Sequence, residues 1–353
     1  MKKTTLYHQH EKLSAKFVDF AGFQMPIQYQ SIILEHNHVR TSVGIFDVSH
    51  MGQFKISGIN AKDFIQKITS NDVEKLIPGK AQYSLLINFE GNIIDDLIIY
   101  HLGDYYLLVV NASNIKKNES WILSHITEGV FFENLSDHMG LIAVQGPNSR
   151  QALQNLFPEV QNLNFYENTL MKNELFIART GYTGELGFEI YAYNHKLDQI
   201  WQNLLSIDGV YPVGLGCRDS LRLEMGYCLY GSEISENDNP YEAGLGWVTK
   251  TSTDFIGSNN LIDCLPTKKL IALTMIDKGI PRKGYKIFSE SSKKEIGYVT
   301  SGIFSPSLQK GICLAYVESS FSKDNDFLIS IRDKYFRLTR NSLPFFKQGT
   351  LHS

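Results

Sequence analysis

The sequence is poor in cysteine and has no long hydrophobic run. Its four cysteines (Cys217, Cys228, Cys264 and Cys313) lack a C-x-x-C spacing, which argues against a disulfide framework and a cysteine-based zinc site. We therefore expect them to be small, buried, apolar residues. The longest apolar runs, at residues 97–100 and 105–110, are far shorter than the roughly 20 residues of a membrane-spanning helix. The first residues also lack the apolar segment of a secretory signal, so we expect no membrane association and a cytoplasmic location.

Several motifs with well-defined chemistry are absent. The sequence contains no G-x-x-x-x-G-K-[ST], no G-x-G-x-x-G opening a helix, no H-E-x-x-H and no G-x-S-x-G. Phosphate-loop, dinucleotide-binding, zinc-protease and hydrolase-elbow chemistry are therefore disfavoured. His36 and His38 are two residues apart, a spacing that puts them on different sides of a helix and makes them a poor metal-binding pair. We expect both to face solvent or to cap a helix, and we expect no metal site.

Charge is shared unevenly along a chain of otherwise ordinary globular composition. With 353 residues, 43% hydrophobic and 20% charged, two or three domains are expected. The net charge is −3, but residues 268–353 carry 15 basic against 7 acidic groups, which leaves 19 basic and 30 acidic groups in residues 1–267. This asymmetry indicates a separate C-terminal module with an acidic partner or ligand. The alternative is a basic face that merely keeps the module soluble.

Helical and strand-like segments mix through the first 260 or so residues, which predicts α+β domains. Strands are expected at residues 53–57, 81–88, 93–100, 105–111 and 141–145. Helices are expected at 195–206, after Asn60 and after residues 146–148. The helix at 195–206 should face inward with Leu197, Ile200, Trp201, Leu204 and Leu205. The helix after Asn60 should face inward with Phe64, Ile65 and Ile68, and the helix after residues 146–148 with Ala152, Leu153, Leu156 and Phe157.

The pattern changes near residue 265. Beyond it come short strand-like stretches at 269–275, 286–289, 295–300, 313–317, 327–331 and 335–339, separated by Gly, Pro, Ser and Asp. A β-barrel or sandwich of about 80 residues fits this spacing best.

Two adjacent carboxylates, Asp95 and Asp96, lie in an apolar strand. Successive side chains of a strand point to opposite faces, so at least one of the two must lie among apolar neighbours. Because burial disfavours the charged form, a buried Asp must be ion-paired, hydrogen-bonded or have a raised pKa. Enzymes use such surroundings to adjust the pKa of a catalytic carboxyl group. The alternative is an Asp satisfied by backbone amides at a turn.

A glycine-rich loop precedes another strand at residues 179–190. Its three closely spaced glycines would let a ligand approach the backbone, and Tyr182 offers a flat ring with a polar tip. The following strand predicts Phe188, Ile190 and Ala192 on one face and Glu189 and Tyr191 on the other. A plain glycine hairpin with an exposed Glu189 is the alternative.

Residues 214–230 have the pattern of a helix with two arginines on one face. Arg218 and Arg222 are four residues apart and would repel each other unless carboxylates neutralise them. Asp219 and Glu224 are available for such ion pairs. The same helix would bring Cys217, Leu221 and Cys228 together. An arginine here could hold a carboxylate ligand or belong to an internal ion-pair network.

Six segments, in order along residues 4–347, together resemble the aminomethyltransferase family, the T-proteins of the glycine cleavage system. The segments are Asp19-Phe-Ala-Gly-Phe-Gln-Met-Pro26, Val43-Gly-Ile-Phe-Asp-Val-Ser-His-Met-Gly52, Ile93-Ile-Asp-Asp-Leu97, Arg179-Thr-Gly-Tyr-Thr-Gly-Glu185, Gly216-Cys-Arg-Asp-Ser-Leu-Arg-Leu-Glu224 and Thr300-Ser-Gly-Ile-Phe-Ser-Pro-Ser307.

The resemblance implies an α+β fold of three domains in a ring-like arrangement, two of them interleaved in sequence, with a small C-terminal β-barrel. It implies a folate-binding α+β domain at residues 1–52 with 139–236, a second α+β domain at 53–138 with 237–264, and the barrel at 265–347.

The resemblance also implies a reaction and its residues. The family transfers the aminomethyl carbon from the dihydrolipoyl arm of the H-protein to tetrahydrofolate, giving 5,10-methylenetetrahydrofolate and ammonia. Asp96 matches the catalytic aspartate. The folate-binding positions match Met51, Tyr83, Asn111, Tyr166, Tyr182, Glu189, Arg218 and Tyr227.

These roles suit the chemistry of folate. Glu189 could accept two hydrogen bonds from the amino-pyrimidine edge, Arg218 could brace Glu189 and that edge, and the tyrosines offer aromatic surfaces. Asp96 would assist the attacking nitrogen N5 and pass a proton. Near the C-terminus some relatives place an aromatic or basic residue close to folate. This chain has Lys347 there, to which no contact is assigned.

Three alternatives remain at this point. A non-catalytic folate-binding relative linked to iron–sulfur clusters would carry a K-G-C-Y-x-G-Q-E loop, where this chain has Arg179-Thr-Gly-Tyr-Thr-Gly-Glu185 without cysteine. A folate-dependent demethylase is usually fused to a flavoprotein, which this length does not accommodate. A nucleic-acid binder built on the basic module lacks any stacking signature, so we expect no nucleic-acid partner.

Overall fold

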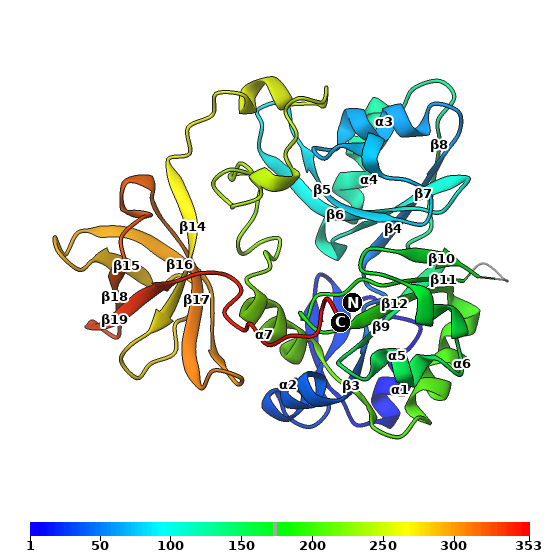
Figure 1. Ribbon diagram of the computed structural model, residues 1–353, viewed down its shortest axis with the longest axis horizontal. Helices are drawn as coiled ribbons and strands as arrows, with labels where there is room; N and C mark the ends of the chain where they lie inside the picture. Colours follow the sequence, from blue (N-terminus) through cyan, green and yellow to red (C-terminus); the bar gives the residue numbers. More distant parts are fainter. Residues whose placement is uncertain (172–174) are drawn as a thin grey trace.

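The structure is a computed structural model in which residues 1–171 and 175–353 are described. Three lobes lie around a common centre (Figure 1): a six-stranded sheet with its helices, a five-stranded sheet with its helices, and a closed barrel. Helix α7 (Leu215–Met225) lies between the barrel and the six-stranded sheet.

The six-stranded sheet has the strand order β10-β11-β12-β9-β3-β13. All neighbours are antiparallel except β3 and β13. Its strands are β3 (Val43–Asp47), β9 (Met139–Gln145), β10 (Asn168–Leu170), β11 (Phe176–Ala178), β12 (Gly187–Tyr193) and β13 (Val210–Pro212). The hairpin of β1 (Lys16–Phe20) and β2 (Phe23–Gln28) lies beside it, as do α1 (Tyr7–Lys12), α2 (Ile32–Thr41), α5 (Ser149–Leu153) and α6 (Asn194–Leu205).

The five-stranded sheet is antiparallel, with the order β5-β6-β7-β4-β8. Its strands are β4 (Gly52–Ser57), β5 (Ala81–Ile87), β6 (Ile93–His101), β7 (Tyr105–Val110) and β8 (Phe131–Asn134). Helices α3 (Ala61–Ile68) and α4 (Ile115–His125) cover one face, and α3 buries Phe64, Ile65 and Ile68 as the sequence predicts.

The two sheets share a core. One hydrophobic cluster contains Tyr100 and Leu107 from the five-stranded sheet together with Phe46, Leu141 and Tyr191 from the six-stranded sheet. On β12, Phe188, Ile190 and Ala192 join a separate cluster with α6, so the predicted alternation is confirmed. Glu189 and Tyr191 therefore face the five-stranded sheet.

The C-terminal lobe is a closed barrel of six strands in the order β14-β17-β16-β15-β18-β19. The strands are β14 (Lys268–Met275), β15 (Lys286–Ser289), β16 (Glu295–Ser305), β17 (Lys310–Glu318), β18 (Asp326–Ile331) and β19 (Lys334–Asn341). Leu223 of α7 packs against Ala272, Ile312 and Leu314 of the barrel. Short 3-10 helices connect the elements: η1 (Val73–Lys75), η2 (Ala112–Asn114), η3 (Pro158–Asn162), η4 (Gly246–Val248), η5 (Ser258–Leu261) and η6 (Ser319–Phe321).

The predicted fold class, α+β with interleaved lobes and a C-terminal barrel, is confirmed. The chain leaves the six-stranded sheet after β3, builds β4 to β8 and returns at β9. After α7 it crosses again, because Ile234, Val248 and Phe255 share a hydrophobic cluster with β5 and β6. The domain bounds given above stay a prediction.

Some local expectations were wrong. The segment 214–230 is helical only to Met225, because Gly226 adopts a left-handed conformation with φ +75° and ends α7, so Cys228 cannot join Cys217 and Leu221 on it. Cys217 and Cys313 are buried, but Cys228 and Cys264 are partly exposed. Helix α5 ends at Leu153, which leaves Leu156 exposed.

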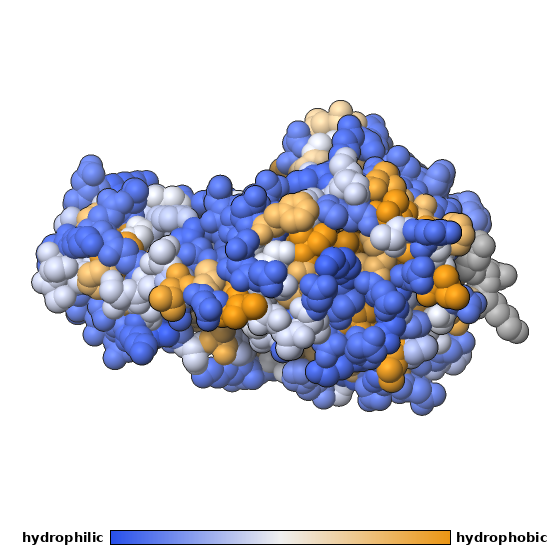
Figure 2. Space-filling model, turned by 90° about the horizontal axis from the view of Figure 1, so that it is seen from above, coloured by the Kyte–Doolittle hydropathy of each residue, from blue (hydrophilic) through white to orange (hydrophobic). Residues whose placement is uncertain are grey.

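Seen from above, the molecule is elongated, with the barrel as its narrow end (Figure 2). Hydrophobic residues are scattered among hydrophilic ones on this face. In the described part of the chain, no helix has both the length and the apolar character to cross a bilayer.

Candidate functional site

A cavity of about 1890 Å³ is lined by all three lobes. All nine site residues implied by the family resemblance line it: Met51, Tyr83, Asp96, Asn111, Tyr166, Tyr182, Glu189, Arg218 and Tyr227. They come from strands, loops and helix ends far apart in sequence, and the fold brings them to one place.

Asp96 faces the cavity from β6. Its Oδ2 accepts a hydrogen bond of 2.9 Å from the Tyr83 hydroxyl, and its Oδ1 accepts one of 2.7 Å from the Asn111 side-chain amide. Tyr83 stands on β5, where Leu85 is the direct partner of Asp96, so the two side chains share one face of the sheet. Burial raises the pKa of the Asp96 carboxyl group, and the hydrogen bonds from Tyr83 and Asn111 only partly offset this.

Asp95 points away from the cavity and is fully buried. Burial, and then the charge of Asp96, raise the pKa of its carboxyl group against the opposing effect of its hydrogen bonds. Its partners are the side-chain amides of Asn111, Asn114 and Asn118 and the backbone N–H of Asn111. The alternative of an Asp whose hydrogen bonds come from backbone amides at a turn is therefore wrong, because side-chain amides supply three of the four donors.

Glu189 is a buried carboxylate with one occupied and one free oxygen. Its Oε2 accepts hydrogen bonds from the hydroxyls of Tyr100 (2.9 Å), Thr180 (2.6 Å) and Tyr191 (3.2 Å). No described residue donates to Oε1. Since Glu189 is 6% exposed and lines the cavity, Oε1 is an acceptor available to a ligand with N–H groups.

Arg218 brings an unpaired cation to the same cavity. Its guanidinium lies over the Tyr182 ring, 4.6 Å from the centroid, and its Nη1 is buried without a partner in the described chain. Burial lowers the pKa of Arg218, and the charge of Glu189 opposes this, but no ion pair joins the two. The expected bracing of Glu189 by Arg218 is therefore not a direct contact in this structure.

Aromatic rings form much of the remaining wall. The rings of Tyr182 and Tyr227 stack with centroids 5.5 Å apart, and Tyr83 stacks on Trp247 at 5.9 Å. Tyr166 has a left-handed backbone, with φ +65°, held by hydrogen bonds to Arg179 and Ala81. Such a conformation is costly for a bulky residue and is often found at functional sites.

Three further residues of the cavity wall, not predicted as site residues, have notable surroundings. His50 lies next to Met51 in a quoted segment; burial lowers its pKa to about 4, so its ring is neutral near pH 7, and its Nδ1 has no partner in the described chain. Trp247 lines the cavity and is 61% exposed. Exposure of so large an apolar side chain can indicate a binding site, but it is visible only in the structure. Cys228 follows α7 and also lines the cavity.

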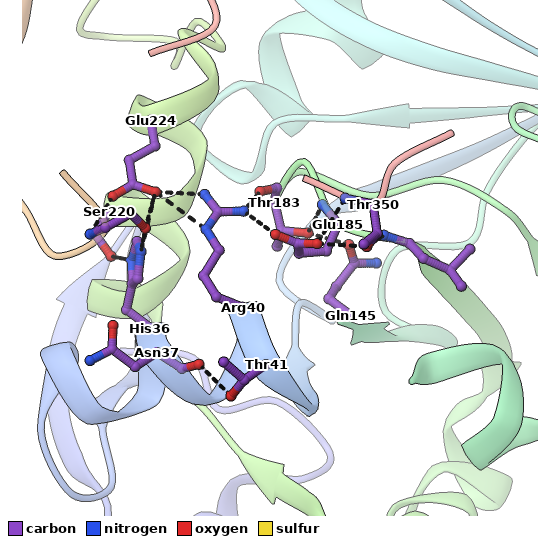
Figure 3. A network of polar contacts seen from close by, with 12 residues as sticks. His36, Asn37, Arg40, Thr41, Gln145, Thr183, Glu185, Ser220, Glu224 and Thr350 are labelled. Atoms are coloured by element: carbon purple, nitrogen blue, oxygen red, sulfur yellow. Dashed lines mark hydrogen bonds and ion pairs between the residues drawn. The ribbon is translucent and has the colours of Figure 1, made fainter. Parts of the chain in front are cut away.

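The carboxylates near the two arginines of α7 are only partly as predicted. Arg222 pairs with Asp219 at 2.9 Å as expected, and also with Glu233 at 2.8 Å, which the sequence did not suggest. Glu224 instead pairs with Arg40 of α2 at 2.7 Å (Figure 3). Burial opposes ionisation of Glu224, but His36, Arg40 and Ser305 outweigh it and lower its pKa to about 2.

His36 belongs to this network, so its expected solvent-facing or capping place is wrong. It is fully buried, contacts Ser220 of α7 and Ser307 of the barrel, and lies 3.2 Å from Glu224. His38 is half-buried and meets the carbonyls of Val43 and Gly209. Among residues 1–171 and 175–353, no group of three or more His, Cys, Asp or Glu is placed to hold a metal ion.

The same network holds the C-terminal tail. Arg40 pairs with Glu185 at 2.7 Å, and Glu185 accepts hydrogen bonds from the backbone and hydroxyl of Thr350 (Figure 3). The tail thereby places Leu351 and His352 in the cavity wall. Lys347 is exposed and lies outside that wall, so it does not supply a contact there.

Known families match nearly the whole chain. Residues 6–253 match the model of the GCVT N-terminal domain, and residues 268–347 match that of the glycine cleavage T-protein C-terminal barrel domain.

Curated relatives and a solved structure agree with these matches. The chain is 47% identical to an aminomethyltransferase of Flavobacterium psychrophilum, with 99% of this chain and 100% of the relative covered. It is also 47% identical to one of Chloroherpeton thalassium, with 99% and 100% covered. The crystal structure of glycine cleavage system aminomethyltransferase T from Bartonella henselae superposes with a TM-score of 0.94 at 32% identity, covering 99% of both chains.

Proposed function

The chain belongs to the glycine cleavage T-protein family and is an aminomethyltransferase, and we propose that its central cavity binds tetrahydrofolate beside the aminomethylated arm of a lipoylated H-protein. The observation that carries this proposal is the gathering of nine predicted residues around one cavity, with Asp96 and the free Oε1 of Glu189 both at its wall.

The cavity has room for both substrates. Its volume of about 1890 Å³ exceeds the roughly 300–1,000 Å³ of a pocket for one small ligand. Tetrahydrofolate supplies the two nitrogens that take up the one-carbon unit, while the carrier regains its free dithiol and ammonia leaves.

Glu189 and Arg218 orient the ring system. Oε1 of Glu189 accepts hydrogen bonds from the amino-pyrimidine edge, because three hydroxyls already occupy Oε2. The unpaired Nη1 of Arg218 donates to a ring acceptor. Tyr83, Tyr166, Tyr182 and Tyr227 supply aromatic surface, and Met51 and Asn111 complete the wall.

Asp96 acts at the reacting nitrogens. Each of its carboxyl oxygens accepts one protein hydrogen bond, which fixes the group and leaves a lone pair on each for a substrate N–H. Its position allows it to stabilise the charge that develops at N5 and to hold or release a proton.

The partner is a lipoyl-bearing protein of opposite charge. The basic excess of residues 268–353 would speed the encounter with an acidic carrier, and salt would screen it. A cytoplasmic location stays a prediction.

The experiment is a turnover assay. Purified protein, tetrahydrofolate and aminomethylated H-protein should together release ammonia and yield 5,10-methylenetetrahydrofolate, whereas omission of either substrate should abolish both products. Folate binding without ammonia release would instead support a non-catalytic folate-binding protein.

A further inference from the structure

The proposed reaction leaves Asp95 without a role, although this residue is the most heavily hydrogen-bonded group near Asp96. Its side chain is fully buried and does not line the cavity, so it cannot touch a substrate. Any effect on the reaction must therefore pass through the wall residues beside it, Asn111, Asn114 and Asp96.

Four N–H donors saturate the Asp95 carboxylate. Oδ1 accepts from the side chains of Asn111 (2.8 Å) and Asn114 (2.7 Å). Oδ2 accepts from the backbone of Asn111 (3.1 Å) and the side chain of Asn118 (2.5 Å). These surroundings stabilise the ionised form of Asp95, because all four neighbouring groups donate hydrogen bonds. A proton on either carboxyl oxygen would point at an N–H group instead of an acceptor.

The Asn111 side chain connects the two acids. Its Nδ2 lies 2.8 Å from Oδ1 of Asp95 and 2.7 Å from Oδ1 of Asp96. A flipped amide would point its carbonyl oxygen at both carboxyl groups. The charge at Asp95 therefore fixes the direction of the amide and, through it, the orientation of Asp96.

The two acids compete for protons, since burial raises the pKa of both and they lie close together. Asp95 has four donors, whereas the Asp96 carboxyl group has only Tyr83 and the Asn111 amide. The larger donor set favours the negative charge on Asp95, because four N–H groups stabilise its anion.

The tyrosines and the cysteine around the pair stay neutral near pH 7. Tyr83, Tyr182 and Cys228 face Asp96, and Tyr230 faces Asp95; burial raises the pKa of each of these groups. Lys117 of α4 carries a positive charge near the pair, and its ammonium group donates hydrogen bonds to Tyr230 and Glu236. Arg218 and Arg222 lie near Tyr182, which faces Asp96.

We propose that Asp95 is a positioning residue whose buried negative charge fixes the Asn111 amide against Asp96 and so sets the orientation and protonation of the Asp96 carboxyl group during the reaction. This inference rests on the proposed function only in giving Asp96 a part in the reaction. A nearby negative charge favours the protonated form of Asp96, which suits a group that must both give and take a proton.

The test is the pH dependence of kcat/KM for tetrahydrofolate in the Asp95→Asn variant at saturating aminomethylated carrier. The like charge to be removed is separated from Asp96 by one amide nitrogen, which lies 2.8 Å from Oδ1 of Asp95 and 2.7 Å from Oδ1 of Asp96. Its removal should shift the limb of the pH profile that belongs to Asp96 by about 1–2 pH units toward lower pH. The Kd of a reduced folate blocked at N5 should stay within about threefold of the parent value, because Asp95 does not line the cavity.

Two controls separate this role from a purely structural one. Asp47→Asn removes another fully buried, hydrogen-bonded carboxylate that does not line the cavity, and should lower the thermal midpoint without moving the limb. Asp95→Ser removes the same charge without placing an amide among four donors, and should give the same shift if Asp95→Asn folds poorly.

Three results would overturn the proposal. The limb could stay in place in the Asp95 variants, the Asp47→Asn control could shift it equally, or the parent limb could lie at the ordinary aspartate pKa of about 4. An infrared titration of protonated carboxyl groups in the folate-free parent and Asp95 variants needs no turnover, so it tests the inference even if the aminomethyltransferase assay fails.

Discussion

Replacing Glu189 by glutamine tests how the cavity recognises its ligand. The three hydroxyl donors from Tyr100, Thr180 and Tyr191 all meet Oε2, so the carbonyl oxygen of the new amide must take that place. The amide NH2 group then occupies the place of Oε1 and points into the cavity. A single isosteric change thus turns the free acceptor into a donor while the hydroxyl cluster keeps its acceptor.

The expected loss follows from these contacts. One hydrogen bond to a charged acceptor contributes about 1.5–3 kcal/mol, and a buried N–H left without an acceptor costs about 1–3 kcal/mol more. We therefore expect Glu189→Gln to weaken the binding of a reduced folate by about 3 kcal/mol or more, which is at least about a hundredfold in Kd.

Calorimetric titration with a reduced folate measures this directly. The matched control is Glu35→Gln, since Glu35 is also buried and accepts three N–H donors, from Tyr29, Gln30 and Gly214, but lies outside the cavity wall. The control should lose thermal stability and keep its folate affinity. A Glu189→Gln variant that binds within about threefold of the parent would refute this account of recognition.

Four further outcomes are expected. Asp96→Asn should bind folate normally but lose roughly 10²- to 10⁴-fold in kcat; a parent-like rate would remove Asp96 from the mechanism. Arg40→Ala leaves two buried carboxylates, Glu185 and Glu224, without their cation, and should cost about 3–5 kcal/mol in unfolding free energy, whereas Arg337→Ala, at an exposed ion pair, should change thermal unfolding little. Because the folded-state pKa of Glu224 is lowered to about 2, its stabilising contribution is complete above pH 5 and is lost as the pH falls toward 2. Glu224→Gln should therefore lose less stability than the parent between pH 5 and pH 2 in acid unfolding; an equal loss in both proteins would contradict this. Turnover at limiting carrier should fall with rising ionic strength, and indifference to salt would contradict docking on the basic module.

The sequence predicted best what depends on local periodicity. The two-residue period of β12 placed Glu189 and Tyr191 on the face opposite Phe188, because strand geometry alone decides it. The barrel strands were predicted for the same reason, since short alternating segments bounded by turn residues need no distant partner to be seen.

Partners that come from distant parts of the chain could not be predicted. His36 was expected at the surface, but its partner Ser307 lies 271 residues away on the barrel. Glu224 was expected to be available to the arginines of its own helix, Arg218 and Arg222, yet it pairs with Arg40, 184 residues away. Side chains of this kind carry no periodic signal, so only the packed structure shows which charges meet.

The nine cavity residues were found by another route. Their convergence was expected from a family resemblance, because no periodicity joins Met51 to Tyr227. The structure added what that resemblance lacked: the saturated oxygen of Glu189, the unpaired Nη1 of Arg218 and the amide that joins Asp95 to Asp96.

The central claim is that one cavity holds a reduced folate between Glu189 and Asp96. A crystal structure of the protein soaked with tetrahydrofolate tests it most directly. The account predicts the amino-pyrimidine edge at Oε1 of Glu189 and the N5 and N10 nitrogens at the Asp96 carboxyl group. An empty cavity at saturating folate, or a folate bound elsewhere on the molecule, would contradict it.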